Sequence, residues 1–318
     1  MSLVKLRLSM LSTLAIIIGV STLFFTFALS LVDALSLFTL VFFVVGFNLI
    51  QWLIAPYLID LMYQAREVSS QEQPDLYQMV ERISQRAKIA VPRIMVANIP
   101  IPNAFAYGSP IAGTRVAVTT GLLRTLESEE VEAVIGHELG HIRHRDVQIM
   151  MFVSVLPALL YYIGFSLSYQ VGYRRDRERG SGLAVIGMLS MALYFALTLL
   201  SLHLSRLREY YADRHSVEVV DDGARKLSEG LAKIVTYTGR VHRVAQVQGV
   251  SSFKALFIAD PDTAEKDTAQ IQRSYGRTSD EALVKEILSR EPSSFDTFVE
   301  IFSTHPNIVK RLRALQEL

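Results

Sequence analysis

The chain has 318 residues, half of them apolar, and a formal net charge of only +1. This near-neutral balance lacks the basic surplus typical of nucleic-acid-binding proteins, so no nucleic-acid partner is expected. The absence of cysteine excludes disulfide bonds, thiolate catalysis and cysteine-ligated zinc. A soluble enzyme of this length is rarely so apolar, and here the apolar residues are concentrated in long blocks.

The first two blocks are uncharged runs over residues 8–32 and 34–59. Each is longer than the roughly 20 residues that a helix needs to span a bilayer, so together they predict a transmembrane hairpin. A cleaved signal peptide is the alternative for the first run, because Lys5 and Arg7 precede it. Against that alternative, the run exceeds the roughly 7–15 residues of a signal core, and no small-residue cleavage site follows.

The polar block 60–146 has the pattern of a mixed α and β domain. Residues 74–88 are expected to form an amphipathic helix. The apolar face of that helix consists of Leu76, Met79, Val80 and Ile83. Short strands are expected at 93–99 and 114–120, because both are rich in β-branched residues and are bounded by proline or glycine. The segment between them, 100–113, is rich in turn residues and is interpreted as a connection.

Ser128 is expected to cap the next helix, because two glutamates follow it in the first turn. This helix runs through the stretch HELGH (137–141). His137 and His141 are four residues apart, so the helix presents both imidazoles on one face to a single metal ion. Zinc suits two imidazoles and one carboxylate, and it keeps a fourth position for water.

Glu138 lies between the two histidines and can take a proton from that water, then return it to the leaving amine. The spacing therefore predicts a zinc hydrolase site with Glu138 as its general base. The alternative is a surface helix that carries the pattern by coincidence, since five-residue patterns occur by chance. The helix cap, the apolar entry at 131–135 and the helical register favour the metal site.

Two further uncharged runs, 147–173 and 180–205, follow this helix. Both exceed the spanning length and predict a second hairpin that crosses the membrane. Pro157 and Gly164 weaken the third run, and long helices lying on the membrane surface are the alternative. The four runs together predict an integral membrane protein with about four transmembrane helices.

The polar block 206–318 has to supply the third metal ligand. Glu209, in EYYAD (209–213), is the best candidate, because zinc hydrolases with two histidines and one glutamate often take that glutamate from a later helix. Asp213 lies on the same helical face and can hold the other N–H of a ligand imidazole. The spacing leaves open an ordinary helix surface rich in charge. Residues 260–297 are charged and weakly periodic, with one short helix expected around 281–289.

Three other histidines are weaker candidates on local sequence. His144 is expected to be a surface group or to support the site, and His215 is expected to face solvent. His305 precedes Pro306, which is expected to open a helix, so a capping or structural histidine is the better local interpretation.

Four motifs carry a resemblance to a known family. They are NAFAYG (103–108), HELGH (137–141), EYYAD (209–213) and THP (304–306), in that order along the chain. The chain resembles the HtpX family of membrane zinc metalloproteases, distant kin of the CAAX prenyl proteases. The likeness extends over most of the chain, apart from 220–300. It implies a mainly α fold with a small β-sheet (α+β) and a zincin-type catalytic domain.

The resemblance also implies roles for single residues. Glu209 becomes the third zinc ligand, with Asp213 as the carboxylate that supports a ligand. Asn103 matches a position beside the cleft, in a strand that pairs with the substrate backbone, as an edge strand can do. His305 matches a histidine that stabilises the tetrahedral oxyanion. The family usually has a small residue or Thr where this chain has Tyr107, so the cleft wall differs there.

The predicted organisation has four parts. These are an N-terminal transmembrane hairpin (1–59), the first part of the catalytic domain (60–146), a second transmembrane or membrane-embedded hairpin (147–205) and the second part of the catalytic domain (206–318). His141 lies six residues before the third run, and Glu209 lies four residues after the fourth. At about 1.5 Å per helical residue, the metal is expected within roughly 10 Å of the bilayer surface.

Basic residues favour a catalytic site on the cytoplasmic side of the cell membrane. Those that would lie on that side are Lys5, Arg7, Arg66, Arg143, Arg145, Arg206, Arg208 and Arg214. Four arginines in the loop of the second hairpin (174–179) oppose this orientation, although Asp176 and Glu178 partly neutralise them. A second hairpin that does not fully cross would remove the conflict.

The predicted function is a zinc-dependent endopeptidase whose partners are the lipid bilayer and membrane-protein or unfolded polypeptide substrates. A role in protein quality control and stress response, by removal of misfolded or damaged membrane proteins, follows from the resemblance alone. One alternative is a prenyl-protein (CAAX-type) processing protease, although those relatives have more than four membrane helices. Another is a non-catalytic zinc-binding membrane scaffold, which Glu138 opposes because a structural site needs no base.

Overall fold

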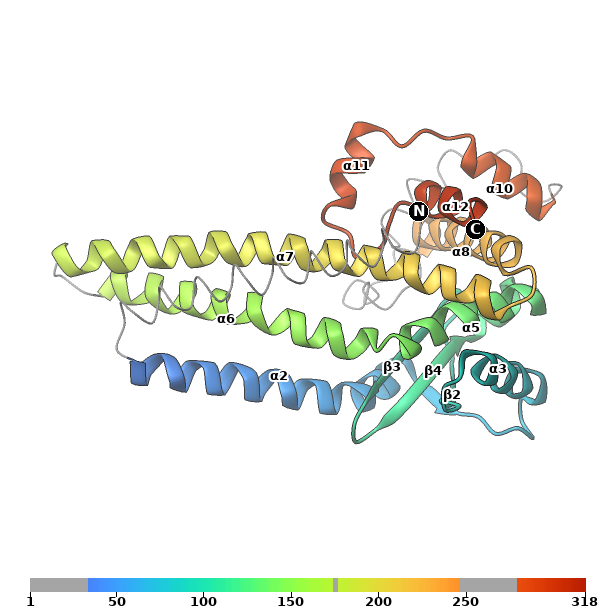
Figure 1. Cartoon of the computed structure of the whole chain (residues 1–318), viewed down its shortest axis with the longest axis horizontal. Coiled ribbons are helices and arrows are strands. Elements are labelled where there is room, and N and C mark those ends of the chain that lie inside the picture. The colour runs from blue at the N-terminus through green and yellow to red at the C-terminus, as the bar shows by residue number, and fades with distance from the viewer. Residues whose placement is uncertain (1–33, 174–176, 246–278) are drawn as a thin grey trace. The chain divides into compact units, whose positions relative to one another are not determined.

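The structure is a computed structural model that describes residues 34–173, 177–245 and 279–318 (Figure 1). The first apolar run, 8–32, therefore lies outside the described residues. The described chain is mostly helical with one small mixed sheet, which confirms the predicted mainly α composition. Its elements are α2 (Ala34–Tyr63), β1 (Ala65–Glu67), α3 (Pro74–Ala87), β2 (Arg93–Ala97), β3 (Ala104–Ser109), β4 (Gly113–Thr119), α4 (Thr120–Thr125), α5 (Ser128–Arg143), α6 (Asp146–Tyr173), α7 (Arg177–Val219), α8 (Gly223–Ala245), α10 (Asp280–Leu288), α11 (Ser294–Glu300) and α12 (Ile308–Gln316).

The described chain divides into two compact units. Of the described residues, the polar unit contains 53–147, 206–245 and 279–318, and the apolar unit contains 34–52, 148–173 and 177–205. In the apolar unit, α6 and α7 pack through a core of Val153, Leu160, Ile163, Leu167, Ile186, Leu197 and Leu204. Large apolar side chains are also exposed on these helices, among them Phe152, Phe165, Met188 and Phe195.

Two of the described helical stretches, Asp146–Phe165 and Gly182–Val219, are long and apolar enough to cross a membrane. Pro157 lies inside α6 without ending it. Gly164 packs against Met191, with 2.9 Å between the position of an added Cβ and the Met191 side chain. The residues that weakened the third run in the sequence are therefore accommodated within one continuous helix.

The sheet of the polar unit has the strand order β1-β2-β4-β3, in which β2 and β4 are parallel and the other pairs are antiparallel. Alternate side chains of each strand enter different cores. Ile94, Val96, Val116 and Val118 join the large helical core, whereas Met95, Ala97 and Ala117 join a smaller core with Tyr63 of α2. The predicted helix 74–88 and both predicted strands are confirmed, and the four residues of the predicted apolar face are buried.

The interpretation of 100–113 as a connection was wrong. Residues 104–109 form β3, which pairs with β4 from Ala104 opposite Val118 to Ser109 opposite Gly113. The strand is short and contains a glycine, and prolines lie close to both of its ends, so its local signal was that of a turn. Pairing with β4 supplies the backbone partners that make it a strand. Because β3 is the last strand of the sheet, no strand among the described residues lies beside its outer edge.

Two helix ends also differ from the prediction. The N-cap of α5 is Glu127 rather than Ser128, because the Glu127 N–H donates to Glu130 Oε2 over 2.8 Å. Helix α12 begins at Ile308 and not at Pro306, because the side chain of Asn307 accepts the N–H of Val309 as a cap. The short helix expected around 281–289 is confirmed as α10.

Helix α5 approaches α7 closely along a seam of small residues. A Cβ added to Gly140 would lie 3.1 Å from His215 Cβ and 3.2 Å from Ala212 Cα. Two turns earlier on α5, the Ser216 hydroxyl donates to the Ala133 carbonyl over 2.6 Å. This contact buries His215, so the expectation that it faces solvent was wrong. The seam also places the polar part of α7, which begins at residue 206, opposite HELGH.

We expect Gly140→Ala to lower the free energy of unfolding by about 1–3 kcal/mol, because the added methyl group overpacks the seam. Gly230→Ala, in α8, is the matched control, since a Cβ there meets nothing closer than 3.5 Å. That substitution should raise the free energy by about 0.5–1 kcal/mol through the better helix propensity of alanine. The thermal unfolding midpoint by circular dichroism checks both, and a rise in both variants would contradict the close approach.

Candidate metal centre

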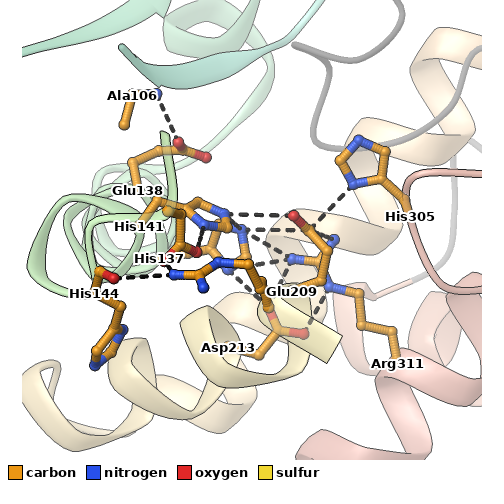
Figure 2. A network of polar contacts seen from close by, with 11 residues as sticks. Ala106, His137, Glu138, His141, His144, Glu209, Asp213, His305 and Arg311 are labelled. Atoms are coloured by element: carbon orange, nitrogen blue, oxygen red, sulfur yellow. Dashed lines mark hydrogen bonds and ion pairs between the residues drawn. The ribbon is translucent and has the colours of Figure 1, made fainter. Parts of the chain in front are cut away.

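Two helices bring three metal-binding side chains to one point. The Nε2 atoms of His137 and His141, both on α5, lie 3.1 Å apart. The Glu209 carboxylate, from α7, places Oε1 3.4 Å from His141 Nε2 and Oε2 3.6 Å from His137 Nε2. Figure 2 shows the two imidazoles and this carboxylate facing one another. The side chains of His137 and Glu209 are buried.

These separations fit one tetrahedral ion. Zinc binds imidazole nitrogen at about 2.0–2.1 Å, so two ligand atoms of a tetrahedral site lie about 3.3 Å apart. The three observed separations are within a few tenths of an ångström of that value. Glu138 lies within 4.8 Å of both histidines as well, but its carboxylate is bonded elsewhere. Glu209 is therefore the carboxylate placed as a ligand.

The nitrogen of each histidine that faces away from the centre, Nδ1, contacts a carboxylate of its own. Asp213 Oδ1 lies 2.8 Å from His137 Nδ1, and Asp146 Oδ2 lies 2.6 Å from His141 Nδ1. A carboxylate in this position fixes the ring orientation and leaves Nε2 facing the metal. Asp213 was named from the sequence, whereas Asp146 was missed. Asp146 is the first residue of α6, and its position five residues after His141 was the only local signal for it.

Each of these aspartates is bound in turn by a buried arginine. Arg311, on α12, donates from Nε and Nη2 to the two Asp213 oxygens, both over 2.6 Å, and its Nη1 lies 3.3 Å from Glu209 Oε2. Arg208 pairs with Asp146 and donates to the His144 carbonyl over 3.0 Å. Both arginines are nearly inaccessible to solvent. Neither was identified from the sequence, because they contact residues far away along the chain.

The charges of the cluster favour a divalent cation. Four buried carboxyl groups surround the centre, from Glu138, Asp146, Glu209 and Asp213, whereas the buried guanidinium groups are two, Arg208 and Arg311. With neutral imidazoles and all four carboxyl groups ionised, this set has two more negative than positive formal charges. Buried charge without a partner is costly. An ion such as Zn²⁺ at the donor atoms would balance the set.

The pKa shifts of His137 and Glu209 agree with the forms that a metal requires. The pKa of His141 differs, because burial lowers it but Glu209 and Glu138 outweigh burial and raise it. Burial, followed by the charge of Arg311, lowers the pKa of His137 to about 4, which keeps its imidazole neutral. Burial opposes ionisation of Glu209, but His305 and Arg311 outweigh it and hold its pKa well below the usual range. A neutral imidazole and an ionised carboxylate are the ligand states of both side chains.

Glu138 is fixed at the outer edge of β3. The Ala106 N–H, in the middle of this strand, donates to Glu138 Oε2 over 2.9 Å (Figure 2). Burial raises the pKa of Glu138 to about 7, and the charge of Glu209 adds to this effect. A bound cation would act in the opposite direction. The carboxyl group therefore lies beside both the metal ligands and the edge strand β3.

Asn103 and Tyr107 flank Ala106 on the same segment. Asn103 is buried directly before β3, where its backbone N–H donates to Thr119 Oγ1 and its carbonyl accepts from the Thr119 N–H, both over 2.9 Å. The Tyr107 hydroxyl donates to Asp60 Oδ1 over 2.6 Å, and its ring joins the small core with Phe105. Tyr107 therefore packs into this core, and its side chain lies on the opposite face of β3 from that of Ala106.

His305 reaches the centre from the loop before α12. Its Nδ1 lies 3.2 Å from Glu209 Oε2, so His305 lies beside a candidate metal ligand. Its role at the oxyanion, which the resemblance implies, stays a prediction. His144 instead packs edge-to-face against Tyr211, with 4.1 Å between ring centroids, and lies 5.3 Å from the ring of His215.

Comparisons with known proteins agree with this geometry. Residues 70–318 match Peptidase family M48. A protein from Thermoplasma acidophilum named Protease HtpX homolog is 36% identical over 279 residues, which cover 85% of this chain and 82% of that one. The chain belongs to the HtpX family of M48 peptidases. The M48 match includes 220–300, the region without a recognised motif.

A second HtpX homolog, from Aeropyrum pernix, is 38% identical over 275 residues, with 85% of this chain and 82% of that one covered. Among solved structures, S. mikatae Ste24p covers 98% of this chain and 67% of its own length, with a TM-score of 0.54 and 16% identity. That likeness concerns the fold. The M48 membership and the HtpX names establish this protein as a metalloprotease.

Proposed function

We propose that this M48 peptidase is a zinc-dependent endopeptidase of the cell membrane that hydrolyses misfolded or damaged membrane proteins. The observation that carries the proposal is the convergence of His137 Nε2, His141 Nε2 and the Glu209 carboxylate within 3.1–3.6 Å of one another. These three side chains would hold the zinc ion. When bound, zinc supplies a Lewis acid that polarises a carbonyl and increases the acidity of water.

Glu138 is the proposed general base. Its carboxylate takes a proton from the water molecule that attacks the peptide carbonyl carbon, and it passes this proton to the leaving nitrogen as the C–N bond breaks. The Ala106 N–H keeps one oxygen of this carboxylate in place through the 2.9 Å bond. His305 is proposed to donate a hydrogen bond to the carbonyl oxygen as it gains charge, which is where such a donor contributes most.

The outer edge of β3 is the proposed substrate site. An extended polypeptide can add to an exposed strand through backbone hydrogen bonds, which requires no particular sequence. Ala106 on this strand contacts Glu138, so a peptide along it would pass beside the base. Asn103, three residues earlier, is proposed to border the same cleft. Such binding suits a protease that removes diverse unfolded chains.

The proposed membrane topology is multi-pass, with about four transmembrane helices and a cytoplasmic catalytic site. The proposed boundaries between membrane hairpins and catalytic parts follow residues 59, 146 and 205. The apolar exteriors of α6 and α7 support it, since large side chains such as Phe152 and Phe195 are more than half exposed. Asp146, which contacts His141, is also the first residue of the candidate span Asp146–Phe165. The centre is therefore attached directly to an apolar helix, as a protease acting at the bilayer surface requires.

Metal removal and return tests the proposal. We expect a chelator to abolish cleavage of a chemically unfolded test protein by the detergent-purified enzyme, and about one equivalent of zinc to restore it. Metal content is measured by atomic emission in the same samples. Cleavage that persists in metal-free protein would contradict the assignment. If the zinc-loaded enzyme cuts a prenylated peptide but no unfolded protein, the CAAX-type alternative replaces the quality-control function.

A further inference from the structure

Helix α11 and the two residues that follow it expose a continuous aromatic face. Phe295, Phe298 and Phe302 are 62%, 58% and 49% exposed, and Ile301 is 40% exposed. Steps of three and four residues place these side chains on one side of a helix. No residue of α11 is buried. Apolar patches of this kind on the surface of a protein mark contact with another protein or with a membrane.

Polar contacts hold α11 in its place. At its N-terminus, Ser293 and Asp296 form a capping box. At its C-terminus, the Glu300 carboxylate pairs with Lys310 and accepts the Asn307 N–H over 3.2 Å. These bonds satisfy the acidic groups of α11 within the polar unit. The aromatic face is therefore directed outward by bonds on the other side of the helix.

A single arginine ties the end of α11 to the end of an apolar run. Arg206 Nη1 donates to the carbonyls of Glu300, Ile301 and Ser303 over 2.8, 3.1 and 2.6 Å. Arg206 is the first residue after the uncharged run 180–205, within the candidate span Gly182–Val219. A helix of seven residues is only about 10 Å long, and each headgroup layer of a bilayer is about 5–8 Å thick.

We propose that α11 is an interfacial helix whose aromatic face enters the lipid headgroup and acyl boundary. This inference rests on the membrane location proposed above. A lipid surface is favoured over a polypeptide because Arg206, the first residue after the apolar run, bonds to the last turn of α11 and so holds it close to where a membrane-spanning run would leave the bilayer. Burial of aromatic side chains supplies the binding, and no basic residue lies on α11, so anionic lipid is not required.

The contact also bears on the metal centre. Ser303, whose carbonyl accepts from Arg206, also accepts the His305 N–H at its hydroxyl oxygen over 3.2 Å. Glu300 holds the next part of the same loop through the Asn307 N–H. The loop that carries His305 is therefore anchored to the last turn of α11. Seating of α11 on lipid would fix the end of this loop.

Site-specific fluorescence quenching tests the proposal, and the absence of cysteine allows a single label. The Phe298→Cys protein carries an NBD fluorophore in phosphatidylcholine vesicles with or without 5-doxyl phosphatidylcholine. Val91→Cys, at an apolar position 41% exposed before β2, is the control. We expect about a twofold or greater loss of fluorescence at position 298, as insertion by about 5–10 Å implies, and little loss at position 91.

Flotation of the labelled protein with the vesicles separates the two proposals. Equal quenching at both positions in protein that floats overturns the role of α11 and leaves the membrane location standing. Protein that does not float overturns the membrane location and this inference with it. Two further results also overturn the lipid contact. In the first, the NBD group at position 298 is shielded from solvent only when unfolded polypeptide is added. In the second, its emission shifts as much in detergent as in vesicles and doxyl lipid does not quench it, which indicates cover by another part of the chain.

Discussion

Replacement of Glu138 by Gln is expected to reduce kcat on an unfolded protein by on the order of 10²–10⁴-fold, the usual contribution of a general base. The amide has nearly the same shape, and its oxygen can still accept the Ala106 N–H that Glu138 accepts over 2.9 Å. What the variant loses is the ability to take and return a proton. The three ligand side chains are unchanged, so the variant should bind as much zinc as the parent.

Glu129→Gln is the matched control, because it makes the same chemical change on the same helix. The Glu129 side chain is 41% exposed and pairs with Arg225 at the protein surface. Its activity should equal that of the parent. Cleavage rates and bound zinc are measured together in all three proteins. Equal rates for Glu138→Gln and the parent would mean that Glu138 is not the base, and loss of zinc from the variant would mean that the residue has a structural role.

The parts of the structure that could be predicted are those whose signals are local. The i, i+4 spacing of His137 and His141 needs only helical geometry, and the amphipathic helix at 74–88 follows from periodicity. The place of Asp213 also followed from its spacing to Glu209 within one helix. These residues are few, but they include two of the three donor side chains, whereas Glu209 was one of two open interpretations from spacing and became a ligand only through the family resemblance.

The parts that could not be predicted depend on contacts between distant segments. Arg311 is 98 residues from Asp213 and 174 residues from His137, and no local pattern connects them. Strand β3 is stabilised by pairing with β4, while its own sequence resembles a turn. Helix α11 is short and its apolar side chains are exposed. It therefore lacks the long, regular apolar pattern by which a core-facing helix is recognised in a sequence.

Replacement of Arg311 by Met is expected to destabilise the metal-free protein by about 3–5 kcal/mol, the usual cost of removing one partner of a buried ion pair. Arg311 donates hydrogen bonds to both oxygens of Asp213 and so compensates the buried charge of this carboxylate. Its Nη1 also lies 3.3 Å from Glu209 Oε2. Burial opposes the charge of its guanidinium, but Asp213 and Glu209 outweigh this and raise its pKa. The methionine has a similar length and leaves both carboxylates without this cation.

Arg313→Met, two residues further on the same helix, is the matched control. Its guanidinium is exposed and donates to backbone carbonyls, among them that of Arg290 over 2.8 Å. For Arg311→Met, the expected loss corresponds to a fall of the thermal midpoint on the order of 10 °C, whereas Arg313→Met should change it little. Zinc should recover part of the loss, because a cation at the donors compensates Glu209. Equal midpoints for the two variants would show that Asp213 keeps its place without Arg311, and the balance of buried charge would then no longer support a divalent ion.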